Sequence, residues 1–401
     1  MTKLGDVCIK IGSGATPRGG REAYKQAGIP IIRSQNVLDW SFSKDGLAFI
    51  DENQAAALAN VEVRPNDVLL NITGDSVARA CMVPLSQTPA RVNQHVSILR
   101  ASEKLDPMYL LCFMQSQKAH LLKLASSGAT RNALTKGMLE TLEIELPALS
   151  RQRAIASIVG AIQSKVTLNN QINGYLEELV LTQFKALEQT RNWKCTRADE
   201  LFEIGIGKTP PRKESEWFSS NPVGNFVWLS IKDMGELGAY SFDSSEYLTP
   251  QAVKDKKIRR VPKGSVLLSF KLTVGRVKIA AVDMTTNEAI AFFASNDPTK
   301  LAYLYPFLLT FDYGRLGSTS SIATAINSKT VKAMTITMPD DHTLARFYAN
   351  VKPLYETIMS NQRENAFLKS LRDNLLPMLM SGEIDVSKVN LAQLNSHLSD
   401  C

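Results

Sequence analysis

The stretch IGIGKTPPR, from Ile204 to Arg212, contains Gly-Lys-Thr, the residues with which nucleotide hydrolases hold phosphate groups. Such a loop needs another glycine five residues before Gly207, because its backbone N–H groups must wrap closely around the phosphates. That position is Phe202, whose side chain would keep the backbone away from a phosphate. An ATP-using enzyme built on Gly207-Lys208-Thr209 is therefore a disfavoured alternative, which a nucleotide titration would test.

The same frame occurs a second time near the start of the chain. The stretch IGSGATPR, from Ile11 to Arg18, repeats Ile-Gly-x-Gly-x-Thr-Pro without the lysine. A feature that occurs twice and lacks its lysine once is typical of a repeated turn rather than of a nucleotide site. We expect the glycines of this turn to adopt positive φ and its proline to fix φ.

Longer segments repeat together with the turn. The two turns are offset by 204 − 11 = 193 residues, and Asp67–Val83 parallels Ser265–Val282. The segment that ends at Pro147 parallels the one that ends at Pro339, with an offset of 339 − 147 = 192 residues. Two copies of so long a unit indicate a tandem duplication rather than a solenoid. The pattern predicts two similar domains and a pseudo-two-fold molecule.

The composition is that of an ordinary globular chain with an excess of positive charge. Its 401 residues are 44% hydrophobic, suggest two or three domains, and carry a formal net charge of +7. The chain has no apolar run long enough for a membrane span and no signal-peptide core, so we expect a cytoplasmic protein without membrane contact. Five scattered cysteines and four histidines disfavour a disulfide framework or a metal site. The charge favours nucleic acid as a partner.

Each half divides into a mixed part and a helical part. Short strand-like runs such as DVLLNI and SVLLSF alternate with turns and short helical segments in the mixed parts, which is typical of an α+β fold. The last 45 or so residues of each half have the period of a long helix. The predicted boundaries are 1–150 and 191–339 for the mixed domains, 151–190 and 340–389 for the helical spacers, and 390–401 for a flexible tail.

Both helical parts carry an apolar stripe that is typical of a coiled coil. The stripes comprise Ile155, Ile158, Ile162, Asn169, Ile172, Leu176 and Leu179 in the first helix, and Leu354, Ile358, Asn361, Asn365, Leu368, Leu375 and Leu379 in the second. We expect the two helices to pair antiparallel within the chain, with the asparagines fixing their register; ordinary core helices are the alternative. Pro353 is expected to kink the second helix or to separate its first turn.

The helical parts also carry the resemblance to a known family. Arg151–Leu179 and Leu368–Val386 resemble the two helical regions of type I restriction–modification specificity subunits, and the ending LRDNLLPMLMSGEI is the more specific of the two. The resemblance covers the chain up to about residue 389. It implies two target recognition domains that each read one half of a bipartite asymmetric DNA site, separated by helices that set the spacing.

The resemblance also implies partners and the absence of catalysis. Two methylation subunits would dock on the helices and heads, and restriction subunits would join through them. S-adenosylmethionine, ATP and Mg²⁺ would bind to those partner subunits, and this chain would carry no cofactor, metal or catalytic residue. An inactive or regulatory relative that acts as a scaffold without reading DNA is the alternative function.

Candidate DNA contacts are the polar side chains in the non-periodic stretches of each mixed domain. Lys and Arg bind phosphates, whereas Arg, Asn, Gln and Ser/Thr also read base edges. The alternative for each is a solvated or ion-paired side chain, and the basic run Lys254–Gly264 is left open between the two. The candidates are Arg18, Arg21, Arg33, Gln35, Asn36, Arg79, Asn93, Gln94 and Arg131 in the first domain, and Lys208, Arg212, Lys213, Lys232, Lys271, Arg276 and Lys329 in the second.

Overall fold

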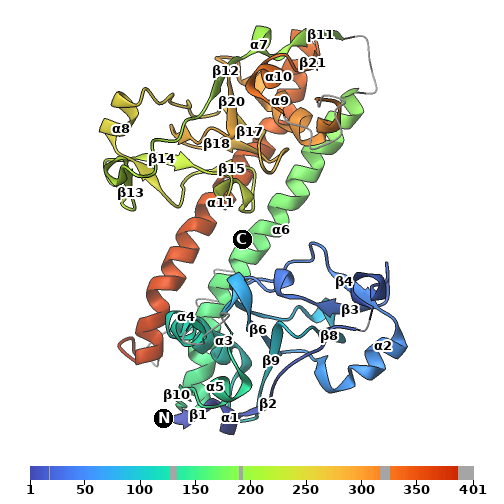
Figure 1. Cartoon of the computed structure of the whole chain (residues 1–401), viewed down its shortest axis with the longest axis vertical. Helices are drawn as coiled ribbons and strands as arrows, with labels where there is room; N and C mark the ends of the chain where they lie inside the picture. Colours follow the sequence, from blue (N-terminus) through green and yellow to red (C-terminus); the bar gives the residue numbers. More distant parts are fainter. Residues whose placement is uncertain (18, 127–132, 189–192, 317–325, 387–401) are drawn as a thin grey trace. The chain divides into compact units, whose positions relative to one another are not determined.

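The chain forms two compact units in a computed structural model (Figure 1). The structure describes all residues except 18, 127–132, 189–192, 317–325 and 387–401, so the predicted tail lies outside it. Unit 1 comprises residues 1–167 and 367–401, and unit 2 comprises residues 168–366. Two long helices, α6 (Leu149–Glu188) and α11 (Asp341–Ser381), each contribute one part to unit 1 and another to unit 2.

Unit 1 contains two four-stranded sheets and a short two-stranded one. The first sheet is antiparallel, in the order β2 (Cys8–Ser13), β9 (Val96–Ala101), β6 (Val68–Asn71) and β7 (Ala80–Met82). The second is mixed, in the order β4 (Ala48–Ile50), β3 (Ile29–Ile32), β8 (Ala90–Val92) and β5 (Glu62–Val63). The short pair joins β1 (Thr2–Lys3) to β10 (Glu143–Ile144).

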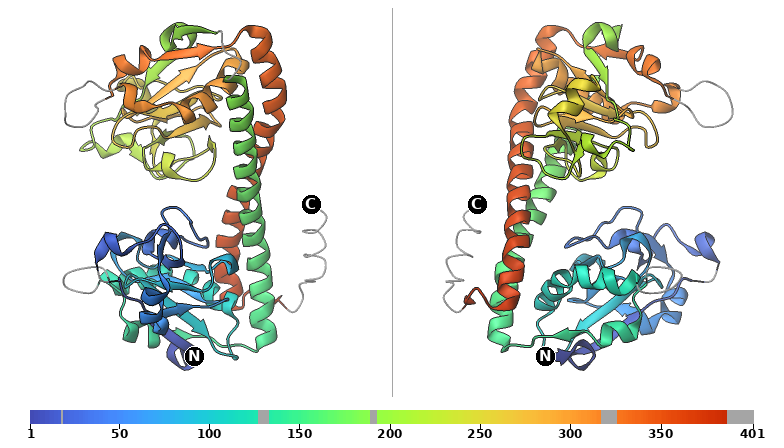
Figure 2. Two further views of the ribbon diagram at one scale, coloured as in Figure 1. Left: turned by 90° about the vertical axis from the view of Figure 1, so that its right-hand side faces the viewer. Right: turned by 60° about the vertical axis from the view of Figure 1, so that its left-hand side comes forward.

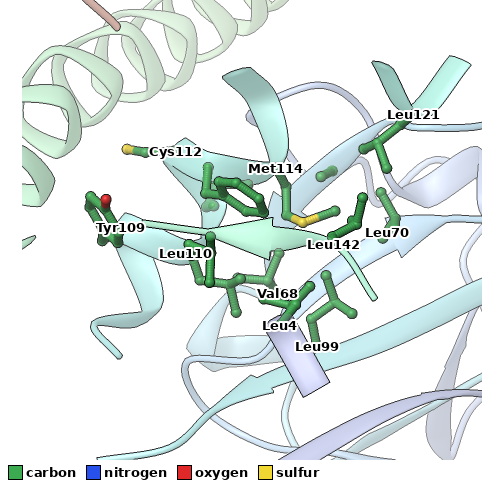
Figure 3. Close-up of a cluster of buried hydrophobic side chains, with 14 of the residues drawn as sticks. Leu4, Val68, Leu70, Leu99, Tyr109, Leu110, Cys112, Met114, Leu121 and Leu142 are labelled. Carbon is green, nitrogen blue, oxygen red and sulfur yellow. The ribbon is translucent and has the colours of Figure 1, made fainter. Parts of the chain in front are cut away.

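Helices cover the first sheet of unit 1 and form its largest core. The helices before α6 are α1 (Leu4–Val7), α2 (Glu52–Ala57), α3 (Pro107–Ser116), α4 (Lys118–Ser126) and α5 (Lys136–Glu140). Asp106 caps α3 by accepting hydrogen bonds from the first backbone N–H groups, and Pro107 suits the first turn. Figure 3 shows Leu110 of α3 beside Val68 of the sheet, within one buried hydrophobic cluster.

Unit 2 repeats this plan. Its larger sheet has the order β12 (Glu203–Ile206), β20 (Ile290–Ala294), β17 (Val266–Ser269), β18 (Val277–Ala280) and β15 (Tyr240–Ser241). A second sheet has the order β13 (Phe218–Ser219), β16 (Tyr247–Leu248), β14 (Phe226–Leu229) and β19 (Thr285–Thr286). A further pair joins β11 (Lys194–Arg197) to β21 (Thr335–Met338).

The short helices of unit 2 correspond in order to four helices of unit 1, and one pair has the same cap. They are α7 (Ala198–Leu201), α8 (Pro250–Asp255), α9 (Pro298–Thr310) and α10 (Ser328–Lys332). Asp297 and Pro298 start α9 in the same way as Asp106 and Pro107 start α3. The order β2-β9-β6-β7 recurs as β12-β20-β17-β18, and β4-β3-β8 recurs as β16-β14-β19. Two mixed units with this shared strand order confirm the predicted α+β class and the tandem repeat.

Within unit 2 the two long helices lie side by side (Figure 2). Asparagine side chains join them. Asn169 Nδ2 donates to Asn365 Oδ1 at 3.0 Å and to Glu364 Oε2 at 2.7 Å. Four residues further along α6, Asn173 Oδ1 accepts from Asn361 Nδ2 at 2.9 Å. Residue numbers rise on α6 as they fall on α11, so the pair is antiparallel as predicted. These complementary amide contacts define one register, which is the usual role of a buried polar residue in a helical seam.

Within unit 1 the helix pair is mostly apolar. Ile155 and Ile158 of α6 belong to the same buried cluster as Leu376 and Leu379 of α11. Arg372 adds a polar contact, because its Nη1 donates to Gln163 Oε1 at 2.5 Å. The seam therefore continues in unit 1 with the same antiparallel order.

The seam prediction is wrong for two residues. Ile172 and Leu179 are 36% and 44% exposed, whereas Asn173 and Val180 are buried at the seam. The cause is a one-residue error of phase after Asn169, since alternating steps of three and four lead from Asn169 to Asn173 and on to Val180. Five other predicted members are only partly buried: Leu176, Leu354, Asn361, Leu368 and Leu375.

Pro353 does not divide the second helix. The helix α11 runs without a break from Asp341 to Ser381, so the predicted separation of its first turn is wrong. The prediction placed Pro353 as a helix breaker because proline lacks a backbone N–H. The helix tolerates this loss, and the Thr357 hydroxyl donates to the Pro353 carbonyl at 2.9 Å.

Unit 2 attaches its larger sheet to the long helices through polar groups. Gln362 of α11 accepts from Tyr240 N at 3.0 Å and donates to Tyr240 O at 3.1 Å, which continues the hydrogen bonding of the edge strand β15. Lys278 of β18 is buried, and its ammonium donates to the carbonyl oxygens of Glu236, at 2.6 Å, and Gly238. Glu177 of α6 supplies the opposing charge.

Burial of Lys278 makes the stability of unit 2 depend on pH. Loss of solvent lowers the pKa of the ammonium from 10.5 to about 8, against the attraction of Glu177. Between these values the folded chain binds fewer protons than the unfolded chain, so this contribution to the free energy of unfolding rises with pH, by up to about 3 kcal/mol. We expect the free energy of unfolding of wild type to rise by this amount relative to that of Lys278→Met between pH 8 and 10.5. Chemical denaturation at each pH measures the difference. Lys254 is exposed, so the difference in free energy of unfolding between wild type and Lys254→Met should not change with pH. A difference between wild type and Lys278→Met that also stays constant would contradict the prediction.

Candidate nucleic-acid interface

The strand registers bring the polar loops of unit 2 to one end of its sheets. Strands β12, β14 and β17 finish at this end, and β18 and β20 start there. The connecting segments are 207–213, 230–239, 270–276 and 287–289. We call them the loop end of unit 2. Loops carried by a rigid sheet commonly bear binding residues, because they expose polar groups without disturbing the core.

Unit 1 has the corresponding arrangement. Strands β2, β3 and β6 finish where β7 and β9 start, and β3 runs parallel to β8. The segments at this end are 14–17, 33–47, 72–79 and 93–95. We call them the loop end of unit 1. Most of the sequence-predicted DNA contacts that the structure describes lie in these two sets of segments.

The repeated turns pack tightly against a neighbouring segment. A Cβ atom added to Gly14 would lie 1.6 Å from Val92 O, and one added to Gly207 would lie 2.2 Å from Thr286 O. Neither glycine has positive φ, so that part of the prediction is wrong: close approach of two backbone segments excludes a side chain here. In unit 2, Gly207 N donates to Ile290 O at 3.1 Å and Lys208 N donates to Thr286 O at 2.9 Å. These backbone groups face the protein, which argues against the nucleotide alternative.

Several unit 1 candidates hold their own loops. Asn36 is fully buried; its amide donates to Ser43 O at 3.0 Å and accepts from Arg33 N at 3.0 Å. Asn36 is therefore a loop-forming residue, and its burial does not fit the predicted DNA contact. Asn93 is also buried: its N donates to Ile32 O and its Oδ1 accepts from His95 N, both at 3.0 Å. It shapes segment 93–95 instead of presenting a side chain.

Other unit 1 candidates remain accessible. Gln35 is exposed, and its amide donates to the carbonyls of Asp45 and Gly46 at 3.2 Å. Arg33 is half-buried, stacks over Tyr24 with its guanidinium 5.3 Å from the ring centre, and donates to Gly46 O. Arg79 is half-buried and Gln94 exposed. Three candidates fall on positions that the structure leaves out: Arg18 and Arg131 lie outside the described residues, and so does the side chain of Arg21.

Unit 2 presents several cations at its loop end. The exposed lysines are Lys208, Lys213, Lys232 and Lys271. Lys208 Nζ donates to Lys256 O at 2.7 Å, and Arg276, which is half-buried, donates from Nη1 to Ile231 O at 2.5 Å. Lys329 is exposed on α10. This helix contacts α7, which precedes strand β12, whereas the loop end lies where β12 finishes. The described contacts therefore do not bring Lys329 to the loop end.

Arg212 is held in place by aromatic rings. Its guanidinium lies 4.4 Å from the ring centre of Phe218 and 4.6 Å from that of Trp228, and its Nη1 is 2.7 Å from Glu246 Oε2. The nearby basic run is partly neutralised in the same way, since Lys256 Nζ lies 2.8 Å from Glu214 Oε2. These contacts order the loops, and they reduce the charge that Arg212 and Lys256 offer to a polyanion.

Two exposed residues of this end escaped the sequence reasoning. Leu272 is 91% exposed at the tip of the β17–β18 hairpin and has φ of +61°, a conformation unusual for leucine. Glu288 is exposed and accepts a hydrogen bond from the Thr209 hydroxyl. Neither residue has the basic or amide side chain that predicts a DNA contact. The sequence has VNQH at residues 92–95 and TNEA at residues 286–289, at about the offset of the repeat, and this correspondence is the signal that could have identified Glu288.

The described residues offer little for catalysis. No group of three or more His, Cys, Asp or Glu in the described part of the chain could hold a metal ion. Burial raises the pKa of the Cys8 and Cys81 thiols to about 12, so both are protonated and poor nucleophiles at neutral pH. Among the described helices, none combines the length and the apolar character that crossing a bilayer requires.

Duplicated units with polar loops at one end of their sheets match a known class of DNA-specificity domains. The family described as the type I restriction modification DNA specificity domain matches residues 1–178 and again residues 190–369. The chain belongs to this family. Specificity subunits are the non-catalytic DNA-recognition components of type I restriction–modification systems, and this chain is one of them.

Individual relatives match nearly all of the chain or about half of it. The specificity subunit of the type I restriction enzyme MjaIX from Methanocaldococcus jannaschii is 22% identical, over 95% of this chain and 92% of the relative. That of the HindI enzyme from Haemophilus influenzae is 26% identical over 48% of this chain and 42% of the relative. The crystal structure of a type I S subunit from M. genitalium shares the fold, with a TM-score of 0.52, 14% identity and 94% coverage of both chains.

Proposed function

We propose that each loop end reads one half of a bipartite, asymmetric DNA site. One observation carries the proposal: the same backbone arrangement occurs at the loop end of both units, but the exposed side chains on it differ. Two readers with one scaffold and different side chains would recognise two different half-sites. The lysines at the loop end of unit 2 would bind phosphates, and the neighbouring polar side chains would contact base edges.

We further propose that the long helices set the spacing between the half-sites and dock partner subunits. Helix α6 is a single helix of 40 residues, about 60 Å long at 1.5 Å per residue, and it runs from unit 1 into unit 2 without a break. A continuous helix is stiff, which suits a spacer of constant length. Two methylation subunits, and restriction subunits through them, would complete a cytoplasmic complex, and S-adenosylmethionine, ATP and Mg²⁺ would bind to those partners.

An exposed apolar stripe on α6 supports the docking role. Its members are Leu168, Ile172, Tyr175 and Leu179, separated by four, three and four residues and each between 36% and 73% exposed. This spacing places them on one face of the helix. A contiguous apolar surface on a helix is typical of a protein interface. The stripe is therefore the proposed contact for a methylation subunit.

Charge in this stripe is expected to disrupt the complex. The double substitution Ile172→Glu, Tyr175→Glu should weaken binding of a co-purified methylation subunit by at least about tenfold, because each side chain contributes roughly 1.5–3 kcal/mol on burial. Calorimetric titration would measure the effect. Val223→Glu, at an apolar residue of unit 2 that is 81% exposed and lies outside the helices, is the control. Equal affinities for the double variant and wild type would exclude the stripe as the docking surface.

The DNA-reading proposal is tested by the methylation it directs. The chain is co-expressed with its methylation subunit in cells that lack other adenine methylation, and their genome is sequenced for N6-methyladenine. We expect one methylated motif with two half-sites and a constant gap. An intact complex with an unmethylated genome would instead favour the inactive or regulatory scaffold.

A further inference from the structure

We infer that Gln94 and Glu288 occupy the same base-reading position in the two units, where Gln94 selects adenine and Glu288 selects cytosine. The inference rests on the proposed function and adds a chemical assignment within each half-site. It starts from a pair of loops, residues 93–95 and 287–289, that share a backbone frame but differ at the residue that the frame presents.

The frame is set by an asparagine in each loop. In unit 2 Asn287 N donates to Leu229 O at 3.0 Å, and Asn287 Oδ1 accepts from Ala289 N at 3.1 Å. Asn93 makes both contacts with the corresponding residues of unit 1. The loops therefore have matching hydrogen bonds at both ends, and residues 94 and 288 are structurally equivalent.

A threonine of the repeated turn orients the presented side chain in each unit. The Thr16 hydroxyl donates to Gln94 Oε1, and the Thr209 hydroxyl donates to Glu288 Oε2. Both presented side chains are exposed at the loop ends. Orientation by a fixed neighbour reduces the side-chain entropy lost on binding, which is a property of preorganised contacts.

The carboxylate of Glu288 is unusual for a phosphate-binding surface. It lies in a loop end that also presents Lys208, Lys232 and Lys271. Phosphates repel a carboxylate, so its presence is favourable only where DNA offers a hydrogen-bond donor. The cytosine N4 amino group in the major groove is such a donor, and Asp and Glu accept from it.

The amide of Gln94 has different preferences. Glutamine can donate and accept at once, which matches the N7 acceptor and N6 donor of adenine. In unit 1 the next residue, His95, adds polar contacts: its Nε2 lies 3.2 Å from Gln94 Nε2 and its Nδ1 lies 2.6 Å from Thr73 Oγ1. In unit 2 the equivalent residue is Ala289. The two positions therefore share a frame but differ in the chemistry that they offer a base.

The test uses the complex of the full chain with its methylation subunit and a DNA library randomised in both half-sites. Methylated products are sequenced for wild type, Glu288→Gln and Gln94→Glu. For Glu288→Gln we expect the preference for cytosine at one position of one half-site to fall by about tenfold or more, with the other half-site unchanged. For Gln94→Glu we expect adenine to be replaced by cytosine at one position of the other half-site.

Controls separate this inference from the function on which it rests. Glu203→Gln removes an exposed carboxylate at the opposite end of strand β12 and should leave both half-sites unchanged. A wild-type motif that is unaltered in Glu288→Gln and Gln94→Glu would overturn the base-reading assignment alone. Weaker binding of the methylation subunit by either variant would overturn it in favour of a protein contact. The absence of any bipartite motif for wild type would overturn the proposed function itself.

Discussion

Replacing Arg372 with methionine is expected to lower the free energy of unfolding by about 2–5 kcal/mol. Arg372 is only 6% exposed in the helix seam of unit 1, and its guanidinium contacts Gln163, Asp373 and the ring of Trp40, 4.5 Å from the ring centre. Methionine would fill much of the volume of the arginine side chain. It would leave the buried Gln163 Oε1 without a hydrogen-bond donor, and an unsatisfied buried acceptor costs roughly 1–3 kcal/mol. Loss of the stacked cation adds about 1–2 kcal/mol.

The same substitution should also loosen one segment at the loop end of unit 1. Trp40 lies in segment 33–47 and has φ of +63°, so its backbone is held in an uncommon conformation. Denaturant unfolding measures the loss of stability, and hydrogen exchange measures protection of segment 33–47. The matched control is Arg363→Met, because Arg363 stacks on Phe242 from an exposed position of the same helix. A loss below 0.5 kcal/mol for Arg372→Met, with normal exchange in the loop, would refute the prediction.

Substitution of three lysines at the loop end of unit 2 is expected to give the largest loss of DNA binding. If Lys208, Lys232 and Lys271 each neutralise a phosphate, the triple alanine variant should bind about 100-fold more weakly near physiological salt. The slope of log K against log salt concentration should fall in magnitude by about 2.7, since each phosphate contact contributes roughly 0.9. Fluorescence anisotropy of the complex with the methylation subunit, repeated across salt concentrations, measures both quantities.

A charge-matched variant makes this result specific. Lys194, Lys300 and Lys332 lie on β11, α9 and α10, and their replacement by alanine removes the same net charge from other elements of unit 2. This control should keep the wild-type salt slope. An equal loss in both triple variants would mean that net charge alone drives binding. An unchanged slope in the loop-end variant would show that phosphates contact other residues.

The domain plan was predictable because its signals are local and recur. The frame Ile-Gly-x-Gly-x-Thr-Pro at Ile11 and Ile204 identified the duplication, and the 3–4 spacing identified both helices. The asparagines at positions 169, 361 and 365 were correctly expected at the seam, since an isolated polar residue in an apolar stripe is conspicuous. The exact seam residues were less predictable. A shift of one residue along the helix places Asn173 in the seam instead of Ile172, and hydrophobicity alone favours Ile172.

The candidate site could be only partly selected from residue types. Gln35 and Asn36 are adjacent and chemically alike, but one is exposed and the other is buried among carbonyl groups of its own loop. Glu288 was not a predicted DNA contact, because it is an acid. The fold places it against Thr209, which is 79 residues earlier in the chain. Such contacts depend on strand register and loop closure, which no local pattern encodes.

The amino-acid sequence by itself determined that the chain is duplicated, that each half joins a mixed domain to a long helix, and that it carries the ending typical of specificity subunits. Periodicity and repetition are properties of neighbouring residues, so they can be read without coordinates. Only the tertiary structure decided which polar side chains are exposed at the loop ends and which are used to build them. Exposure is a property of packing, because a side chain is buried or free according to segments that are distant in the chain.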